Sequence, residues 1–387
     1  MFLVLVSEYN RRIAFCGVIT LNTLWPFIIN NAKSLSVYAV IFVLLENRWP
    51  AKQGQARWRK DTHLDLLYSF LMPLLVIPLL AAPLGWVSAR FLGPDLFAVA
   101  EQGQGSAVRV EAAPQHGKIH IDAGRPAYTP EAGFAGTDRF VLAATDGKNT
   151  LTRFFLARVD GASGVSESGQ VAFAVADEAW SGEITQGIGG WFLGARGWIG
   201  SLPLWVQIFL AVFVVDFVGY WRHRFQHLPG FWSFHSIHHS SEQVDWLSNE
   251  RFHYVDQVIT LLAEQAACIL LFNDFYVLSA SHLLRRGYGI FIHANLRWSY
   301  GPLNYVFVSP LLHRWHHAAD PVAADKNYAT FFSFFDFALG TLYLPQTKAD
   351  PQAFGVYQRT LPKSFIGQFI YPFRDLATGK SGWAKIL

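Results

Sequence analysis

Cysteine, charge and basic runs are scarce in this chain of 387 residues. Its two cysteines, Cys16 and Cys268, lie in apolar stretches, which excludes a disulfide framework and a zinc site built from thiolates. Charged side chains make up 15% of the residues, against about a quarter in soluble domains, whereas 52% are hydrophobic. The net charge is only +3, and the sequence has no basic run of the kind that nucleic-acid binding needs. These shortages indicate a membrane protein.

Three apolar runs are long enough to cross a bilayer, which takes about 20 residues. Ile13–Ala32 and Leu66–Val87 contain no charged side chain, although the second run contains three prolines. Prolines are tolerated in membrane helices where neighbouring groups satisfy the freed carbonyls. Ile199–Trp221 predicts another span, interrupted only by Asp216.

Two further apolar stretches are ambiguous. Ser34–Leu45 is too short to span a membrane alone, so it either pairs with the preceding run as a broken hairpin or extends it past Lys33. Val258–Ile292 is apolar but contains four charged side chains, which favours a helical hairpin that does not fully cross.

The character of the sequence changes between about residues 98 and 176. Short alternating segments separated by turn residues replace the long apolar runs, a pattern typical of a small antiparallel β-sandwich. The predicted strands are Ala107–Glu111, Lys118–Asp122, Arg139–Ala144 and Leu151–Val159. The segment AYTPEAGFAGTDRFVLAATDG at residues 127–147 resembles the immunoglobulin-like and cadherin-like repeats of bacterial surface proteins.

The distribution of charged residues along the chain supports a division into three domains in different environments. Residues 94–183 hold 12 acidic and 7 basic side chains, whereas the loop before Leu66 holds five basic ones between Arg48 and Lys60. The positive-inside rule assigns that loop to the cytoplasm. We therefore predict N-terminal transmembrane helices in residues 1–97, an extracytoplasmic β-sandwich in 98–176, and a transmembrane and catalytic region in 177–387. The fold class is mainly α, a helical membrane bundle with a cytoplasmic histidine-rich cap.

Histidine is the abundant residue that needs an explanation, because nine of the 14 histidines fall into short motifs after residue 222. Residues three and four apart on a helix share a face, with Cβ atoms about 5–6 Å apart. Neutral imidazole is the usual protein ligand of iron and zinc, and nine rings exceed what one metal binds. The motifs are HRFQH (223–227), HSIHH (235–239), HAN (293–295) and HRWHH (313–317).

One pair with the same spacing is excluded. His116 and His120 lie in HGKIH, within a segment of strand pattern. A strand rises about 3.3 Å per residue, so positions four apart are separated by roughly 13 Å and cannot chelate one ion.

The order of these motifs, with SSE after the second and DKNYA after the last, resembles the fatty acid hydroxylase and sterol desaturase superfamily. The likeness runs from about Leu204 to Pro345 and includes ENRWP and RWRKD near residues 46–61. The sequence departs from relatives that hydroxylate sphingolipid acyl chains at Gly289, where they have a second histidine four residues before the equivalent of His293. The β-sandwich is also not a usual part of the family.

This resemblance implies a non-haem di-iron, oxygen-dependent enzyme on a helical membrane scaffold. It implies as metal ligands His223, His227, His235, His238, His239, His293, His313, His316 and His317. Groups that accept the free ring N–H of such ligands orient them, and the candidates nearby are His253, Asp256 and Asp325. His253 is also a candidate for a further ligand, although a structural role beside Arg251 is favoured.

The predicted function is O2-dependent hydroxylation or desaturation of a fatty acyl, sterol or related lipid by two iron ions, for which zinc is a possible substitute. The sequence carries neither a dinucleotide-binding motif nor a cytochrome b5 signature, so electrons are expected from a ferredoxin or cytochrome b5-like donor with its reductase. The expected location is the bacterial inner membrane. The alternative is a membrane-anchored adhesion protein that acts through the outer β-sandwich and has a structural metal site. A metal-ion transporter is disfavoured because the histidines cluster beyond a span.

Overall fold

The computed structural model describes residues 21–92, 107–122, 125–134, 136–145, 150–159, 172–180, 188–272, 274–346 and 349–378. They fall into two compact units. The first comprises the described parts of 1–82, 212–265 and 279–387, and the second those of 83–211 and 266–278. Mainly helical structure with a small antiparallel β region agrees with the predicted fold class.

Long helices correspond to the apolar runs. They are α2 (Leu21–Arg48), α3 (Thr62–Leu92), α6 (Leu204–Gln226), α8 (Tyr254–Leu271) and α9 (Phe275–His293). Among the described residues, three helical stretches are long and apolar enough to span a membrane, namely Ile28–Arg48, Leu204–Gln226 and Tyr254–Leu271. The chain is therefore an integral membrane protein, as its composition predicts.

The N-terminal ambiguity is resolved in favour of one long helix. α2 is continuous through Lys33, so the apolar stretch after that lysine extends the preceding run, and the broken hairpin is wrong. Residues 13–20 of the first predicted span lie outside the described residues. α3 is likewise continuous through its three prolines, as expected for a helix whose neighbours satisfy the freed carbonyls.

The span predicted from Ile199 begins later. A separate helix, α5 (Ile188–Gly200), ends there, and the chain turns before α6 starts at Leu204. The side-chain amide of Gln207 donates to the carbonyls of Gly200 and Leu202, which satisfies two acceptors at this break. The predicted helical hairpin after residue 258 is present as α8 and α9.

The inserted β region consists of two antiparallel sheets, one of order β1-β4-β5-β6 and one of β2-β3. They face each other through Tyr128 of β3 and Phe140 of β4, whose rings stack at 5.9 Å. The Tyr128 hydroxyl donates to the buried Asp138 carboxylate at 2.9 Å. The strands are β1 (Ala107–Ala112), β2 (Gly117–Asp122), β3 (Arg125–Pro130), β4 (Gly136–Thr145), β5 (Thr150–Val159) and β6 (Ala172–Trp180).

Four of these strands were predicted from alternation, and β3 and β6 were missed. β3 has Pro126 near its start and Pro130 at its end, and proline argues against a strand unless the strand has a free edge. β3 pairs with β2 alone, so it has such an edge. β6 (AFAVADEAW) alternates alanine with larger residues only weakly, and its partner is the well-patterned β5.

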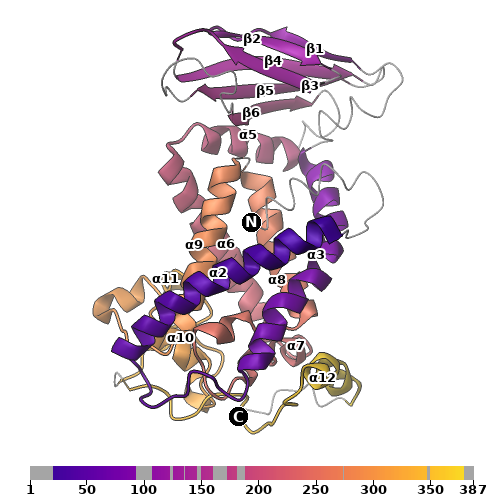
Figure 1. The fold of residues 1–387 in the computed structure, drawn as a ribbon. Helices are drawn as coiled ribbons and strands as arrows, with labels where there is room; N and C mark the ends of the chain where they lie inside the picture. Colours follow the sequence, from indigo (N-terminus) through magenta and orange to yellow (C-terminus); the bar gives the residue numbers. More distant parts are fainter. Residues whose placement is uncertain are drawn as a thin grey trace. The chain divides into compact units, whose positions relative to one another are not determined.

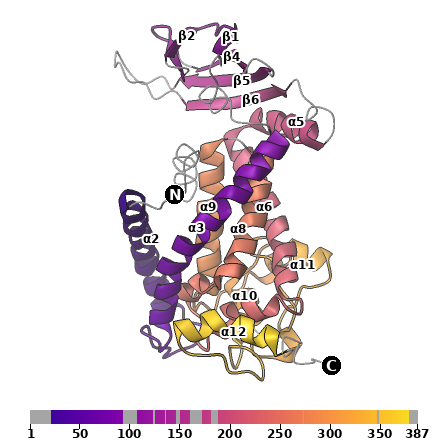
Figure 2. The same ribbon diagram turned by 90° about the vertical axis from the view of Figure 1, so that its right-hand side faces the viewer.

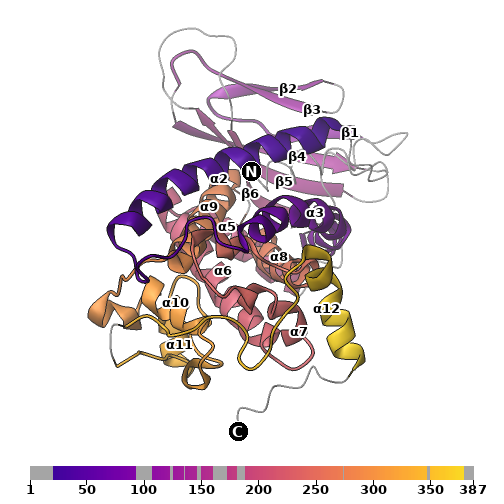
Figure 3. The same cartoon turned by 60° about the horizontal axis from the view of Figure 1, so that its bottom comes forward.

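Short helices complete the first unit on the side where α6 and α9 end (Figure 3). A cluster of buried side chains, among them Val212, Tyr220, Ile292 and Leu312, joins them to these helices. The short elements are α7 (Trp232–His235), η2 (His238–Ser240), η3 (Trp246–Glu250), η4 (Gly301–Tyr305), α10 (Pro310–His316), η5 (Pro321–Ala323), α11 (Phe334–Ala338) and α12 (Phe365–Ala377).

Asp216 is the charged residue that interrupts the α6 span, and the structure explains its burial. Its carboxylate accepts the backbone N–H groups of Phe331 and Phe332 at 2.8–3.1 Å. Arg285 of α9 lies 3.5 Å away. Asp216 therefore fixes the loop before α11 rather than a histidine of the motifs.

Candidate metal centre

The nine predicted histidines converge in the first unit, and all are buried. They form two groups in which the possible ligand nitrogens lie within 4.8 Å of one another. The first group is His223, His227, His235, His239 and His316, and the second is His238, His293, His313 and His317. Rings of the two groups are neighbours, since the ring centroids of His239 and His317 are 4.4 Å apart.

Each HxxHH motif is divided between the groups in a regular way. Histidines four residues apart stay together, as in His235 with His239 and His313 with His317. The histidine just before the last one of each motif, His238 or His316, belongs to the other group. Each motif therefore bridges two adjacent sites, an arrangement that spacing alone left open.

The ends of four helices position histidines in these two groups. α6, α7, α9 and α10 all end at or beside the cluster, and each has histidine in its last turn. The C-terminal end of a helix carries a partial negative charge, which favours a nearby cation. Four such ends around one cluster favour bound cations in addition to supplying ligands.

Within the first group, the Nε2 atom of His223 lies 3.0 Å from that of His235 and 3.1 Å from that of His316. The Nδ1 atom of His223 is 2.7 Å from the Tyr328 carbonyl, and that of His316 is 2.7 Å from the Lys326 carbonyl. A carbonyl only accepts, so both Nδ1 atoms are donors.

The second group repeats this pattern. The Nε2 atom of His293 lies 3.0 Å from that of His313 and 3.2 Å from that of His238. The Nδ1–H groups of His238 and His293 donate to the carbonyls of Arg251 and Gly289 at 3.0 and 2.6 Å. The Gly289 carbonyl therefore orients His293, the one histidine of its motif.

His223, His316, His238 and His293 are neutral rings with protonated Nδ1 atoms, so they present only lone pairs at Nε2, and the His223–His316 and His293–His238 contacts are not hydrogen bonds. Two facing lone pairs at 3.1–3.2 Å repel unless a cation lies between them or one ring is protonated. Burial, reinforced by the neighbouring histidines, lowers the pKa of His238, His239 and His317 well below the usual histidine range. Protonation is therefore disfavoured, and the arrangement is a metal-binding one.

Orphaned ring nitrogens support the same conclusion. The Nε2 atoms of His227 and His239 are buried without a hydrogen-bond partner, as are the Nδ1 atoms of His313 and His317. Buried polar atoms without partners are costly and rare in folded proteins. Four of them in one cluster, all on imidazoles, fit metal ions coordinated by these rings.

Both predicted orienting carboxylates lie within reach of a ring nitrogen of a candidate ligand. The Nδ1 atoms of His235 and His227 are each 3.1 Å from a carboxylate oxygen, of Asp256 and Asp325 respectively. His253 differs, since its Nε2 donates to the Phe369 carbonyl and its Nδ1 accepts from Val255. It lies outside both groups, and its hydrogen bonds to the backbone give it a structural role.

Backbone carbonyls are the site groups that sequence reasoning missed. Asp325, Lys326 and Tyr328, all within the DKNYA motif, each contact one histidine of the first group. Asp325 and Asn327 have positive φ angles of 55° and 57°, a conformation that residues other than glycine rarely adopt. The motif itself was the available signal, because Asp and Asn tolerate this conformation best.

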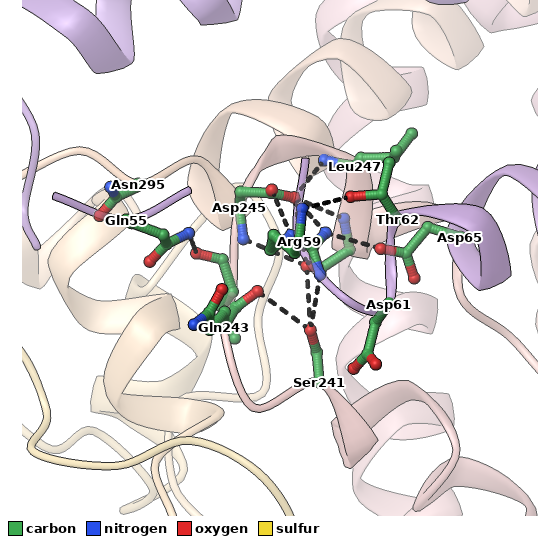
Figure 4. A network of polar contacts seen from close by, with 12 residues as sticks. Gln55, Arg59, Asp61, Thr62, Asp65, Ser241, Gln243, Asp245, Leu247 and Asn295 are labelled. Carbon is green, nitrogen blue, oxygen red and sulfur yellow. Dashed lines mark hydrogen bonds and ion pairs between the residues drawn. The ribbon is translucent and has the colours of Figure 1, made fainter. Parts of the chain in front are cut away.

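A buried charge network holds the segment that carries the second motif (Figure 4). Arg59 bonds both Asp65 and Asp245, and Arg251 bonds the other oxygen of Asp65 at 2.6 Å. The carbonyl of Arg251 accepts the Nδ1–H of His238. The loop before α3 thereby fixes a residue that orients a candidate ligand. RWRKD, which contains Arg59, was part of the resemblance but had no role assigned.

A pocket opens onto the first group. Its wall contains His227, His239 and His316. Trp232 also lines it, with its ring centroid 4.8 Å from that of His227. The remaining wall is formed by Ala318, Asp320, Ala324, Asp325, Gly355, Val356, Tyr357 and Arg359.

The strand predicted around His116 and His120 is present. His120 lies within β2, and His116 precedes that strand and stacks on Phe134 at 4.5 Å. Neither belongs to a metal-binding group among the described residues.

Comparison with known proteins agrees with this geometry. Residues 208–341 match the family model described as fatty acid hydroxylase, and residues 91–154 match a bacterial Ig domain. Both regions of resemblance noted in the sequence are thereby confirmed. No solved structure matches the chain.

Similar curated proteins are lipid-modifying enzymes by name. An ornithine lipid hydroxylase of Rhizobium tropici is 28% identical over 177 residues, which are 46% of this chain and 53% of the relative. Alkylglycerol monooxygenases of Caenorhabditis elegans and Homo sapiens are 31% and 33% identical over 39% and 35% of this chain, and 30% of each relative. The chain thus spans about half or less of the curated relatives that it matches.

Proposed function

We propose that this chain, whose residues 208–341 form a fatty acid hydroxylase domain, is a membrane oxygenase that hydroxylates a lipid with O2. The observation that carries the proposal is the double set of buried imidazoles with facing Nε2 atoms. Such a set binds two adjacent metal ions. Imidazole donors suit iron, and zinc is a possible substitute in a preparation.

All nine histidines are proposed as metal ligands, five at one ion and four at the other. Two bound iron ions would supply the redox chemistry that activates dioxygen and oxidises an unactivated C–H bond. The chain's own residues hold this centre in a fixed geometry. Asp256, Asp325 and four backbone carbonyls accept the other ring N–H groups of six of these histidines, which sets their tautomer and the direction of their lone pairs.

The pocket beside His227, His239 and His316 is the proposed place where the lipid carbon approaches the centre. Trp232 and Val356 supply apolar contact, and the burial of the histidines keeps bulk water from them. Holding a reacting carbon in line contributes strongly, since effective molarities for good alignment are worth about 7–11 kcal/mol.

Hydroxylation is favoured over desaturation because the similar curated proteins are named hydroxylase and monooxygenase. Their names also favour a polar lipid as the substrate, such as an ornithine lipid or an alkylglycerol. The comparisons do not favour the alternative of an adhesion protein that acts through its Ig-like region.

Several further assignments belong to the proposal. The electron donor is a ferredoxin or cytochrome b5-like protein with its reductase. The chain lies in a bacterial inner membrane, with the metal centre in the cytoplasm and the Ig-like region in the periplasm. The domains are residues 1–97, 98–176 and 177–387.

The test is to purify the chain in detergent, quantify its iron, and compare the lipids of a knockout strain with those of its parent. We expect about two irons per chain and a hydroxylated lipid that the knockout lacks. His238→Ala should lose iron from the second group. Metal-free protein with an intact fold would contradict the proposal, and so would identical lipids in the two strains.

A further inference from the structure

α12 is apolar on two sides, because Phe365 and Tyr371 pack inward against a buried cluster while a second apolar stripe faces outward. Its outward face carries Ile366, Ile370 and Phe373, with exposed fractions of 69%, 37% and 43%. Its inward face carries the buried polar residues Gln368 and Asp375. A helix that turns its apolar stripe outward has an apolar partner on that side.

The buried polar residues anchor α12 firmly, so the exposed stripe is not the result of a loosely placed helix. Asp375 accepts the Ser233 hydroxyl at 2.7 Å and lies 3.3 Å from Arg359. Gln368 donates to the Pro362 carbonyl at 2.9 Å. Ser364 caps the first turn by accepting the N–H of Gly367.

Three observations indicate a lipid bilayer as the occupant. First, α12 runs across the direction of α6 and α8, the orientation of a helix that lies in a membrane surface (Figure 2). Second, its apolar side meets the end of a candidate span. Leu376 approaches Gly230, just beyond the exposed Phe225 and Leu228, which continue the exposed stripe of Phe217 and Trp221 on α6. Third, the exposed Arg374 flanks the stripe, where a cation meets lipid phosphates.

We infer that α12 is an interfacial helix whose Ile366–Ile370–Phe373 face rests in the lipid surface next to the end of α6. Asp375 of α12 bonds Ser233, which lies two residues before the second histidine motif, and Arg359, which lines the pocket. The contact of α12 with lipid therefore holds the start of this motif and one wall of the pocket at the membrane surface. A lipid would then reach the pocket without leaving the bilayer. The inference does not depend on the proposed activity, since its test needs no turnover.

The experiment places an environment-sensitive fluorophore on Ile370→Cys in the full chain, with Cys16 and Cys268 replaced by alanine. The protein is reconstituted in nanodiscs of phosphatidylethanolamine and phosphatidylglycerol. We expect a blue-shifted emission and quenching by nitroxide-bearing acyl chains several-fold stronger than for a label at the exposed Gln352→Cys. Iodide in the water should quench the two labels in the opposite order.

A second label at Ile366→Cys guards against a local effect at one position, and metal content equal to that of the unlabelled chain reports an intact fold. Equal iodide quenching at residues 370 and 352, with no quenching by nitroxide lipid, would overturn the inference. Protection from both quenchers together with crosslinking between copies would overturn it too, because it would assign the face to a second copy.

Discussion

Two regions of this chain contain pairs of histidines four residues apart, and among the described residues only one region gathers them into a group that could hold a metal ion. His223 in the last turn of α6 and His227 just after its end stand one helical turn apart, with ring centroids at 5.2 Å, and belong to the same group. Around β2, His116 and His120 belong to an extended segment, and His116 stacks on Phe134 instead. The backbone between two histidines decides whether their spacing has chemical meaning.

The same two regions also use buried carboxylates differently. Asp256 accepts the ring N–H of His235, so its charge acts on a candidate ligand. Asp138 accepts the backbone N–H groups of Gln115 and His116 and the hydroxyl of Tyr128, so its charge ties together the two sheets. One carboxylate orients a ligand, and the other stabilises a fold.

The largest expected effect comes from His239→Ala, with His120→Ala as its matched control. His239 is buried and its Nε2 has no hydrogen-bond partner. Replacing it with alanine therefore removes a candidate metal ligand without breaking a hydrogen bond of Nε2. We expect loss of activity and of metal from the first group, with membrane insertion intact. The control should retain both metals. Metal analysis and product formation measure this, and normal turnover of the His239 variant would contradict the ligand assignment.

A smaller effect is expected for Asp256→Asn, with Asp138→Asn as its counterpart. The Asp256 variant keeps the shape of the side chain but weakens the orienting hydrogen bond, and loss of such a partner typically costs about 10–100-fold in metal affinity. Competition with a chelator measures it. Unchanged affinity would show that His235 is oriented without this charge.

Asp138→Asn should leave metal affinity unchanged and destabilise the Ig-like region. The carboxylate satisfies three donors, and leaving one buried donor unpaired costs roughly 1–3 kcal/mol. Thermal unfolding of the full chain, followed by protease sensitivity within residues 107–159, measures this loss. A metal defect in this variant would remove the contrast between the two carboxylates.

The sequence predicted the convergence of the histidines because three pairs four residues apart, beginning at His223, His235 and His313, lie on helical turns that aim each pair at one group. It did not predict which histidine of each HxxHH motif crosses to the other group. That choice depends on how α6, α7, α9 and α10 meet, which is a tertiary property. For the same reason, the carbonyls of Lys326 and Tyr328 gave no sequence signal, since every residue has one.

The smallest expected effect comes from deleting residues 100–174, which removes the excluded histidine pair altogether. Every histidine of the two groups, and every described group that bonds to one, lies in the first unit at residues 223–328. The remaining residues of β6 would then link α3 to α5. We expect unchanged metal content, because no ligand or orienting group is lost. Loss of iron on this deletion would show that the Ig-like region is needed to hold the helices in place, and the two regions would no longer be independent.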